Sequence, residues 1–350
     1  MNTCFPGLLS EFDNHHLVIS LADKKSELSG FIAIHRGDAK QPAFGATRIW
    51  PYASSQEALR DALRLSKAMS YKAALAGLPY GGGKAALIGG FSAKKRIHIL
   101  EAYARRVNAL HGGFITGTDV GLTTQDLRIL RKRSPYMVGF KVNPEEYTAL
   151  GMFFAVRSLL QEVFGKKDIM GRSFAIQGLG KVGSEFLKLI YKEAGRVFVA
   201  DIQTELVRKA QKLFPGIRAV SPAAIATQKV DIYVPCALSH ALNSKSIPKL
   251  RCSLVVGGAN NQLENEKAGD TLFSQGIFYA PDYVVNAGGL ISVTDEFEHN
   301  TPSTKRIGEK VKRIGETIQR IFRETAQQKI PPNRIADAAA ESLLKAHHEY

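Results

Sequence analysis

The chain of 350 residues is 45% hydrophobic and 23% charged, which is the composition of an ordinary globular protein. Its length predicts two domains, and no apolar run approaches the ~18 residues that a transmembrane helix requires. A net charge of +15 can indicate a nucleic-acid partner. However, the lysines and arginines are spread along many segments without a helix-turn-helix, RNA-binding or zinc-finger signature, which argues against nucleic-acid binding.

Cysteine usage and the start of the chain bear on the cellular compartment. Cys4, Cys236 and Cys252 are widely spaced and odd in number, which argues against a disulfide framework or a zinc site and fits a reducing cytoplasm. Residues 1–17 are polar and carry two acids, so they do not have the pattern of a secretory signal. We therefore expect a cytoplasmic protein without a metal site.

The first part of the chain has the pattern of a mixed α/β domain. Apolar stretches at residues 17–21 and 31–34, bounded by polar turns, predict strands. Ser54 can cap a helix whose apolar residues recur at helical spacing. A second helix is predicted from about residue 93 to 110, and a strand with its loop over residues 114–119.

A lysine that follows three glycines is the most informative feature of this part. Residues 77–84 read Gly-Leu-Pro-Tyr-Gly-Gly-Gly-Lys, and Lys72 lies a short way upstream. Glycines let a ligand approach the backbone closely and leave the Lys84 ammonium unshielded, so this lysine is a candidate for proton or water chemistry. The alternative is a flexible glycine loop with a solvated lysine. A phosphate-binding P-loop does not fit, because the glycine spacing differs and Ala85 stands where a hydroxyl is needed.

The second part of the chain predicts a dinucleotide-binding fold. Residues 139–147 carry Pro144 and mixed charges and are the candidate hinge, and a helix over 149–164 follows. The chain then runs through a strand at 173–177, a glycine turn, a helix over 184–194 and a strand at 197–200. This unit is the context in which a Gly-x-Gly-x-x-Gly pattern gains meaning.

Each residue of that pattern has a physical role. Gly178 permits the tight turn, Gly180 lets a pyrophosphate approach the backbone, and Gly183 lets the helix pack on the sheet. The phosphates would lie at the positive end of the helix dipole. Asp201, about 20 residues on, would accept hydrogen bonds from the adenosine ribose and repel a 2′-phosphate, which favours NAD over NADP. The alternative is a nucleotide-free fold with a chance glycine pattern.

Further strands are predicted at residues 231–238, 254–261 and 283–289, with asparagine and glycine at the ends of the last two. Ligands bind beyond the carboxyl ends of strands in open α/β sheets. By themselves such residues are more often turn formers than ligand contacts.

Nine motifs occur in one order over roughly residues 30–295. They are Gly-Ala-Thr-Arg at 45–48, Met-Ser-Tyr-Lys at 69–72, Gly-Gly-Gly-Lys at 81–84, Thr-Asp-Val-Gly at 118–121, Thr-Ala-Leu-Gly at 148–151, the glycine turn at 178–183, Pro-Cys-Ala-Leu at 235–238, Ala-Asn-Asn at 259–261, and residues 279–289. Together they resemble the superfamily of glutamate, leucine, phenylalanine and valine dehydrogenases, with the closest likeness to its leucine dehydrogenase branch.

The resemblance implies an α/β fold with two domains and an active site in the cleft between them. Residues 1–143 would form an α/β domain for substrate binding and oligomerisation. Residues 144–300 would form a Rossmann-type NAD-binding domain, and residues 301–350 would be helices that return to the hinge or the first domain. The implied reaction is reversible oxidative deamination of an L-amino acid with NAD and water, by a homo-oligomer.

The resemblance also assigns roles to site residues. Lys72 would bind the substrate carboxylate, Lys84 would activate the attacking water, and Asp119 would exchange protons with the amine. Thr148 would contact the nicotinamide carboxamide, Asn261 its ribose, and Asn286 the substrate amino group or the nearby ring. Further cofactor contacts are implied for Lys181, Val182, Cys236, Ala237, Leu238, Ala259 and Asn260, and a side-chain pocket for Phe44, Gly45, Ala46, Met69, Leu290 and Val293.

Structural roles are the alternatives for three of these residues. Lys72 can be an ordinary lysine at a helix end, and Asp119 can cap the turn before Val120. Thr148 can be a plain helix N-cap, because threonine favours that position.

Two departures from the family pattern affect the prediction. The loop at residues 139–147 is short, and Glu145 falls where the family has a serine near the nicotinamide. The pocket residues are mostly as large as or larger than their counterparts, which favours leucine, valine or isoleucine as substrate. Gly117 adds room and leaves an aromatic amino acid as the alternative, and the short loop leaves a non-catalytic amino-acid- or NAD-binding relative.

Overall fold

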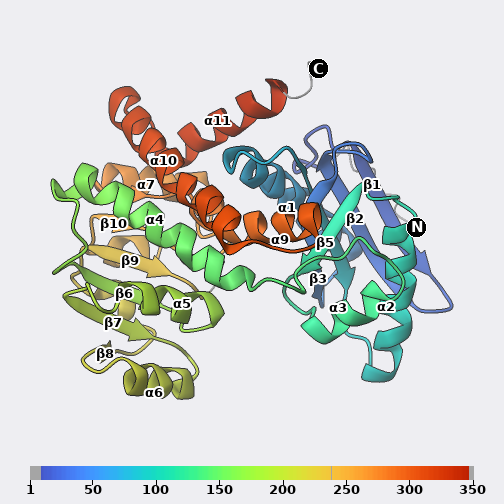
Figure 1. Cartoon of the computed structure of the whole chain (residues 1–350), viewed down its shortest axis with the longest axis horizontal. Coiled ribbons are helices and arrows are strands. Elements are labelled where there is room, and N and C mark those ends of the chain that lie inside the picture. The colour runs from blue at the N-terminus through green and yellow to red at the C-terminus, as the bar shows by residue number, and fades with distance from the viewer. Residues whose placement is uncertain (1–8, 238, 347–350) are drawn as a thin grey trace. The chain divides into compact units, whose positions relative to one another are not determined.

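The computed structural model describes residues 9–237 and 239–346, which form two compact units (Figure 1). Unit 1 contains the described residues up to Val142, residues 293–301 and the end of the last helix from Leu343. Unit 2 contains residues 143–292 and 302–342. Residues 293–300, which the prediction assigns to the second domain, belong to unit 1, and residues 302–342, which it sets apart from that domain, belong to unit 2. Among the described residues, no helix is long and apolar enough to cross a membrane.

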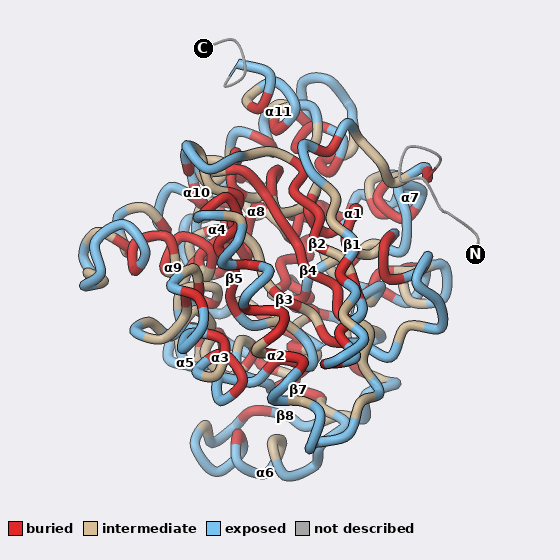
Figure 2. The backbone as a smooth tube through the Cα atoms, turned by 90° about the vertical axis from the view of Figure 1, so that its right-hand side faces the viewer, coloured by how far each residue is buried: buried red, intermediate tan, exposed pale blue. Residues whose placement is uncertain are grey.

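Unit 1 is built on a five-stranded mixed sheet in the order β1-β2-β4-β3-β5. Strands β1 and β2 are antiparallel, as are β2 and β4, whereas β3 is parallel to both β4 and β5. The strands are β1 (Leu17–Asp23), β2 (Leu28–Arg36), β3 (Ala43–Trp50), β4 (Gly81–Ile88) and β5 (Phe114–Thr118). Figure 2 shows the buried backbone of this sheet, in which β4 is buried over its first seven residues.

Helices pack on this sheet and form its two cores. The predicted cap is confirmed, because the Ser54 hydroxyl accepts a hydrogen bond from the Glu57 N–H and α1 (Ser55–Leu75) begins at the next residue. Leu59 and Leu63 of α1 form one core with small residues of β2 and β4. The second core contains Tyr103 from α2 (Ala93–Asn108) and Leu127 from α3 (Thr124–Arg131).

Unit 2 has the predicted doubly wound pattern, a six-stranded parallel sheet in the order β11-β10-β9-β6-β7-β8. Its strands are β6 (Ser173–Gln177), β7 (Arg196–Ala200), β8 (Arg218–Ala219), β9 (Ile232–Pro235), β10 (Leu254–Val255) and β11 (Phe278–Tyr279). Its helices are α4 (Pro144–Phe164), α5 (Lys181–Ile190), α6 (Thr204–Leu213), α7 (Glu266–Ser274), α8 (Asp282–Val285) and α10 (Thr304–Gln328). Helix α9 (Gly288–His299) begins in unit 2 and ends in unit 1, and α11 (Pro332–Ala346) does the same.

The structure corrects three predicted elements. Residues 283–289 are not a strand: Pro281 and Asp282 begin the short helix α8, in which the Val285 and Asn286 N–H groups donate to the carbonyls of Pro281 and Asp282. Helix α5 starts directly after Gly180 rather than at residue 184. The last four residues of the predicted hinge already belong to α4, because Pro144 is compatible with a first helical position.

Candidate functional site

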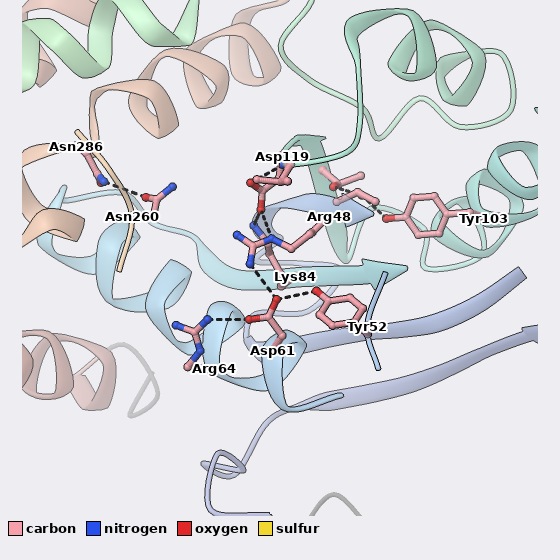
Figure 3. Close-up of polar contacts among 12 residues, drawn as sticks. Arg48, Tyr52, Asp61, Arg64, Lys84, Tyr103, Asp119, Asn260 and Asn286 are labelled. Atoms are coloured by element: carbon pink, nitrogen blue, oxygen red, sulfur yellow. Dashed lines mark hydrogen bonds and ion pairs between the residues drawn. The ribbon is translucent and has the colours of Figure 1, made fainter. Parts of the chain in front are cut away.

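Lys84 and Asp119 come together in unit 1, although 35 residues separate them (Figure 3). The Lys84 ammonium donates to Asp119 Oδ2 at 2.5 Å, and the lysine is 6% exposed. Strand β3 lies between β4, which carries Lys84, and β5, which Asp119 follows. It presents Ala46 opposite Lys84, and this small side chain leaves room for the lysine side chain to reach across β3 to Asp119. Asp119 follows β5 directly, and its Oδ1 also accepts a hydrogen bond from the Val120 N–H, so the predicted turn-capping role holds beside the ion pair.

Two cations determine the charge of Asp119. Burial alone would raise the pKa of this carboxyl, but the Lys84 ammonium and the Arg48 guanidinium outweigh burial and hold the pKa well below its usual range. Asp119 is therefore a carboxylate at neutral pH and can accept a proton only from a donor placed beside it.

The three glycines before Lys84 are not a flexible loop, because they form the buried start of β4. A Cβ at Gly82 would lie 2.0 Å from the Ser70 nitrogen, so only glycine lets β4 pack directly on the backbone of α1. This contact places the Met69-Ser70 peptide against the strand that carries Lys84. Lys72 lies half-buried in the last turn of α1.

Sequence reasoning missed a network of charges behind Asp119. Arg48 Nε donates to Asp119 Oδ2 at 3.2 Å, and the other end of the same guanidinium donates to Asp61 Oδ2 at 2.9 Å (Figure 3). Asp61 on α1 also accepts hydrogen bonds from the Tyr52 hydroxyl and from Arg64, each at 2.7 Å. One signal in the sequence could have indicated Arg48. It lies two residues after Ala46, so the two side chains share one face of the predicted strand.

Phe44, a predicted pocket residue of unit 1, packs against two aromatic rings. Its side chain is fully buried, 4.5 Å from the Tyr80 ring and 5.4 Å from the Phe297 ring between centroids. The Tyr80 hydroxyl donates to Glu298 at 2.8 Å, which ties the loop before β4 to the end of α9. Of the other predicted pocket residues, Gly45, Ala46, Met69 and Val293 are half-buried in unit 1, and Leu290 is buried in the part of α9 that belongs to unit 2.

The glycine turn of unit 2 has the geometry that the pattern predicts. Gly178 has a φ of +98°, which favours glycine, and a Cβ at Gly183 would lie 2.0 Å from the Gly178 carbonyl oxygen. Gly180 is exposed, and a Cβ there would meet no atom within 4 Å. The turn borders a groove of about 740 Å³ that is also lined by residues of α5 and α6. Two glycines therefore shape the turn, and the third is open to a ligand at the N-terminus of α5.

Asp201 already binds this turn through its own carboxylate. Its Oδ2 accepts a hydrogen bond from the Leu179 N–H at 2.7 Å, and its Oδ1 accepts one from the Gln203 N–H at 2.8 Å. The acid is half-buried at the end of β7, where the dinucleotide pattern requires it.

Thr148 and Glu145 have partners that explain their positions in α4. The Thr148 hydroxyl donates to the Pro144 carbonyl at 2.8 Å, and Asn143 is the N-cap, so Thr148 is not the cap. Glu145 accepts a hydrogen bond at 2.7 Å from Lys181, the first residue of α5. The acid in this first turn of α4 is therefore paired with a cation of the glycine turn.

Asn286 is a buried residue of unit 2 whose amide binds the exposed Asn260. Its Nδ2 donates to Asn260 Oδ1 at 2.9 Å and approaches the Gly258 carbonyl at 3.4 Å (Figure 3). Within the part of the chain that the structure describes, its Oδ1 is buried without a hydrogen-bond partner. A buried acceptor of this kind fits a ligand that donates an N–H, such as an amine or a carboxamide.

Of the remaining predicted cofactor contacts, Val182 lies in α5, and those at residues 236–237 and 259–261 lie in loops after β9 and β10. Burial raises the pKa of Cys236 to about 12, which keeps its thiol protonated at neutral pH. Asn261 adopts a φ of +52°, and Ala259 binds the Pro235 carbonyl through its N–H. Val182 is half-buried and Ala237 is exposed, whereas Leu238 lies outside the described residues.

Comparison with known proteins gives consistent matches over the whole chain. A family model for the Glu/Leu/Phe/Val dehydrogenase dimerisation domain matches residues 15–136, and a model for glutamate/leucine/phenylalanine/valine dehydrogenase matches residues 201–348. Leucine dehydrogenase of Geobacillus stearothermophilus is 37% identical over 95% of this chain and 91% of its own length. Phenylalanine dehydrogenase of Lysinibacillus sphaericus is 39% identical over 95% and 89%. The crystal structure of L-tryptophan dehydrogenase from Nostoc punctiforme has a TM-score of 0.84 at 38% identity and covers 96% of this chain and 97% of its own.

Proposed function

The chain belongs to the glutamate, leucine, phenylalanine and valine dehydrogenase family of amino-acid oxidoreductases, and on that premise we propose that it converts a branched-chain L-amino acid to its 2-oxo acid and ammonium, reversibly and with NAD. The observation that carries the chemistry is the buried ion pair of Lys84 and Asp119. The reaction removes protons from both an amine and a water. Two proton-transferring groups within hydrogen-bond distance of each other, here Lys84 and Asp119, meet that requirement.

Each residue has a separate task in this proposal. Lys72 binds the substrate carboxylate, and Asp119 accepts a proton from the substrate ammonium. A bound oxidised nicotinamide would supply the acceptor for a hydride from the substrate α-carbon, and the oxidised substrate is then an iminium. Lys84, neutral at this stage, takes a proton from the water that adds to the iminium carbon, and Asp119 returns its proton to the nitrogen of the carbinolamine. The C–N bond then breaks as the carbonyl forms, the departing ammonia takes the hydroxyl proton and leaves as ammonium, and Lys84 releases the water proton to solvent. The unpartnered Asn286 Oδ1 accepts an N–H from the substrate amine or the cofactor carboxamide.

The packing of Phe44 supports a small aliphatic side chain. This ring is buried between the Tyr80 and Phe297 rings, so rotating it to admit a bulky substrate would disrupt two aromatic contacts. An aromatic substrate is the second candidate, supported by Gly117, which lies opposite Ala46 in the sheet, and by the phenylalanine and tryptophan dehydrogenase relatives.

Two further properties belong to the proposal. The carboxylate of Asp201 at the end of β7 supports NAD rather than NADP, since a 2′-phosphate would meet a negative charge there. A cytoplasmic homo-oligomer is supported by the widely spaced, odd number of cysteines and by the match of residues 15–136 to a dimerisation domain.

The test is NADH formation with valine, isoleucine, leucine, phenylalanine, tryptophan and glutamate, each with NAD and with NADP. We expect the aliphatic substrates and NAD to give the highest kcat/KM. Lys84→Ala should lower kcat by about 10²–10⁴-fold, which is the range for loss of a general base. Lys95→Ala, which removes an exposed lysine paired with Glu27, is the control and should retain activity.

Two outcomes would contradict the proposal. A higher kcat/KM for phenylalanine or tryptophan would replace the branched-chain substrate by an aromatic one. No turnover with any amino acid, in folded protein whose melting temperature rises with NAD, would indicate a non-catalytic relative.

A further inference from the structure

Arg48 is the second cation on Asp119, and it differs from the first in one respect. The proposed chemistry requires Lys84 to release and take up a proton, so its charge changes during the reaction. A guanidinium does not deprotonate in proteins. Arg48 therefore supplies a positive charge to Asp119 Oδ2, at 3.2 Å, that persists through every step.

Arg48 is fixed in place from the side away from Asp119. Asp61 Oδ2 accepts a hydrogen bond from Arg48 Nη1 at 2.9 Å, and the same carboxylate binds the Tyr52 hydroxyl and Arg64. The side chains of Arg48 and Asp61 are only 16% and 14% exposed, so solvent screens this pair weakly. The guanidinium thus bridges two carboxylates in a geometry that a lysine ammonium cannot reproduce.

We propose that Arg48, anchored by Asp61, is a positioning residue that fixes the Asp119 carboxylate and keeps it ionised while Lys84 is neutral. This inference rests on the proposed function, because it takes Asp119 as the acceptor of the ammonium proton and Lys84 as the acceptor of the water proton. Without Arg48, a neutral Lys84 would leave the buried Asp119 without the charge of either cation that contacts it, and the carboxyl would retain a proton instead of accepting one from the substrate ammonium.

The charged and titratable groups around this site enter the test. Lys84 from β4 and Arg48 from β3 face Asp119, and Asp61 and Arg64 from α1, with Tyr52 after β3, face Arg48. Arg48→Gln removes the charge at nearly constant length, Arg48→Lys keeps the charge but not the bridge, and Asp61→Asn removes the anchor. Arg172→Gln is the matched control, because it breaks an arginine–aspartate pair with Asp231 that lies in unit 2.

The first measurement is the pH dependence of kcat and KM for the best amino acid. Arg48→Gln should lower kcat by about 10²-fold, the cost of a misplaced catalytic group, and change KM by less than about threefold. The acidic limb of its kcat profile should move up by about one pH unit, as expected when an opposite charge is lost. Arg48→Lys should recover part of the rate, Asp61→Asn should lower it by about tenfold, and Arg172→Gln should leave the profile unchanged.

The second measurement does not depend on turnover. The pH at which acid lowers the melting temperature is compared between wild type and Arg48→Gln, each with and without Asp119→Asn. The contribution of Asp119 should be lost at a higher pH when Arg48 is absent. An identical onset, or a kcat within twofold of wild type with an unshifted profile, would overturn the proposal. If wild type turns over no amino acid, the proposed function fails while this comparison still decides the role of Arg48.

Discussion

The ring of Phe297 packs edge-on against the ring of Phe44, with 5.4 Å between their centroids. Phe44 is fully buried, whereas Phe297 is 37% exposed, so the contact joins a fixed ring of the proposed side-chain pocket to a residue that can be changed without opening the core. Since Tyr80 confines Phe44 from another side, Phe297 determines whether the Phe44 ring has room to turn.

Phe297→Ala should therefore broaden the side-chain preference. We expect the ratio of kcat/KM for phenylalanine to that for leucine to rise about tenfold, which is within the range that apolar pocket changes produce. Trp50→Leu, at the far end of the same strand as Phe44, is the control and should leave the ratio unchanged. A ratio within twofold of wild type for Phe297→Ala would mean that Phe44 does not limit the substrate.

Asp201 should determine the cofactor preference. Replacing Asp201 by serine removes the negative charge at the end of β7, and we expect the ratio of kcat/KM with NADP to that with NAD to rise at least about tenfold, since like-charge contacts cost several kcal/mol. The melting temperature should also fall, because the carboxylate binds the Leu179 and Gln203 N–H groups. Asp270→Asn, an exposed acid paired with Arg334, is the charge-matched control. A fall in stability without a change in the ratio would assign Asp201 a structural role alone.

Local patterns predicted the elements of this fold better than the pairing between them. The roles of Gly178 and Gly183 could be predicted, because the turn and the helix that follows occupy a few consecutive residues. Lys84 and Asp119 could each be named, but their contact depends on β3 lying between β4 and β5, which is a non-local property of the sheet order.

The missed residues have the same explanation. Arg48 and Asp61 belong to a strand and a helix, and only the packing of α1 on the sheet brings their charges together. The wrong strand at residues 283–289 was suggested by adjacent valines, which favour β-structure. Backbone hydrogen bonds that begin at Pro281 override that preference.

Asp126 should make the stability of unit 1 depend on pH in acid. Burial alone would raise the pKa of this carboxyl, but hydrogen bonds from Arg96 and Thr123 outweigh burial and lower it from 3.8 to about 2. Because the folded pKa is below the unfolded one, the stabilisation is complete above about pH 4 and is lost as the pH falls towards 2. Asp126→Asn should cost about 1–2 kcal/mol at pH 6, as loss of a helix cap does, and progressively less below pH 4. Urea unfolding of both proteins between about pH 6 and about pH 2.5, a range that spans the unfolded pKa, measures the difference in free energy of unfolding. A difference that stays constant over this range would contradict the assignment.

Glu296 fastens the segment that leads into unit 2. Its buried carboxylate accepts hydrogen bonds from the N–H groups of Gly139 and Phe140 on Oε1 and of Lys141 on Oε2, at 3.1–3.2 Å. Glu296→Gln should cost about 1–3 kcal/mol, because the amide presents a donor to at least one N–H that then has no acceptor. It should also speed hydrogen exchange at residues 139–141.

The matched control for Glu296→Gln is Glu101→Gln, which breaks an ion pair with the exposed Arg133 at 3.0 Å. A pair of this kind contributes at most about 1 kcal/mol, so the control should be nearly as stable as wild type. Equal losses of stability in the two variants, or unchanged exchange at residues 139–141 in Glu296→Gln, would mean that the three N–H groups do not depend on the carboxylate. Faster exchange confined to that segment would identify Glu296 as the residue that holds the chain rigid up to Val142, where unit 1 gives way to unit 2.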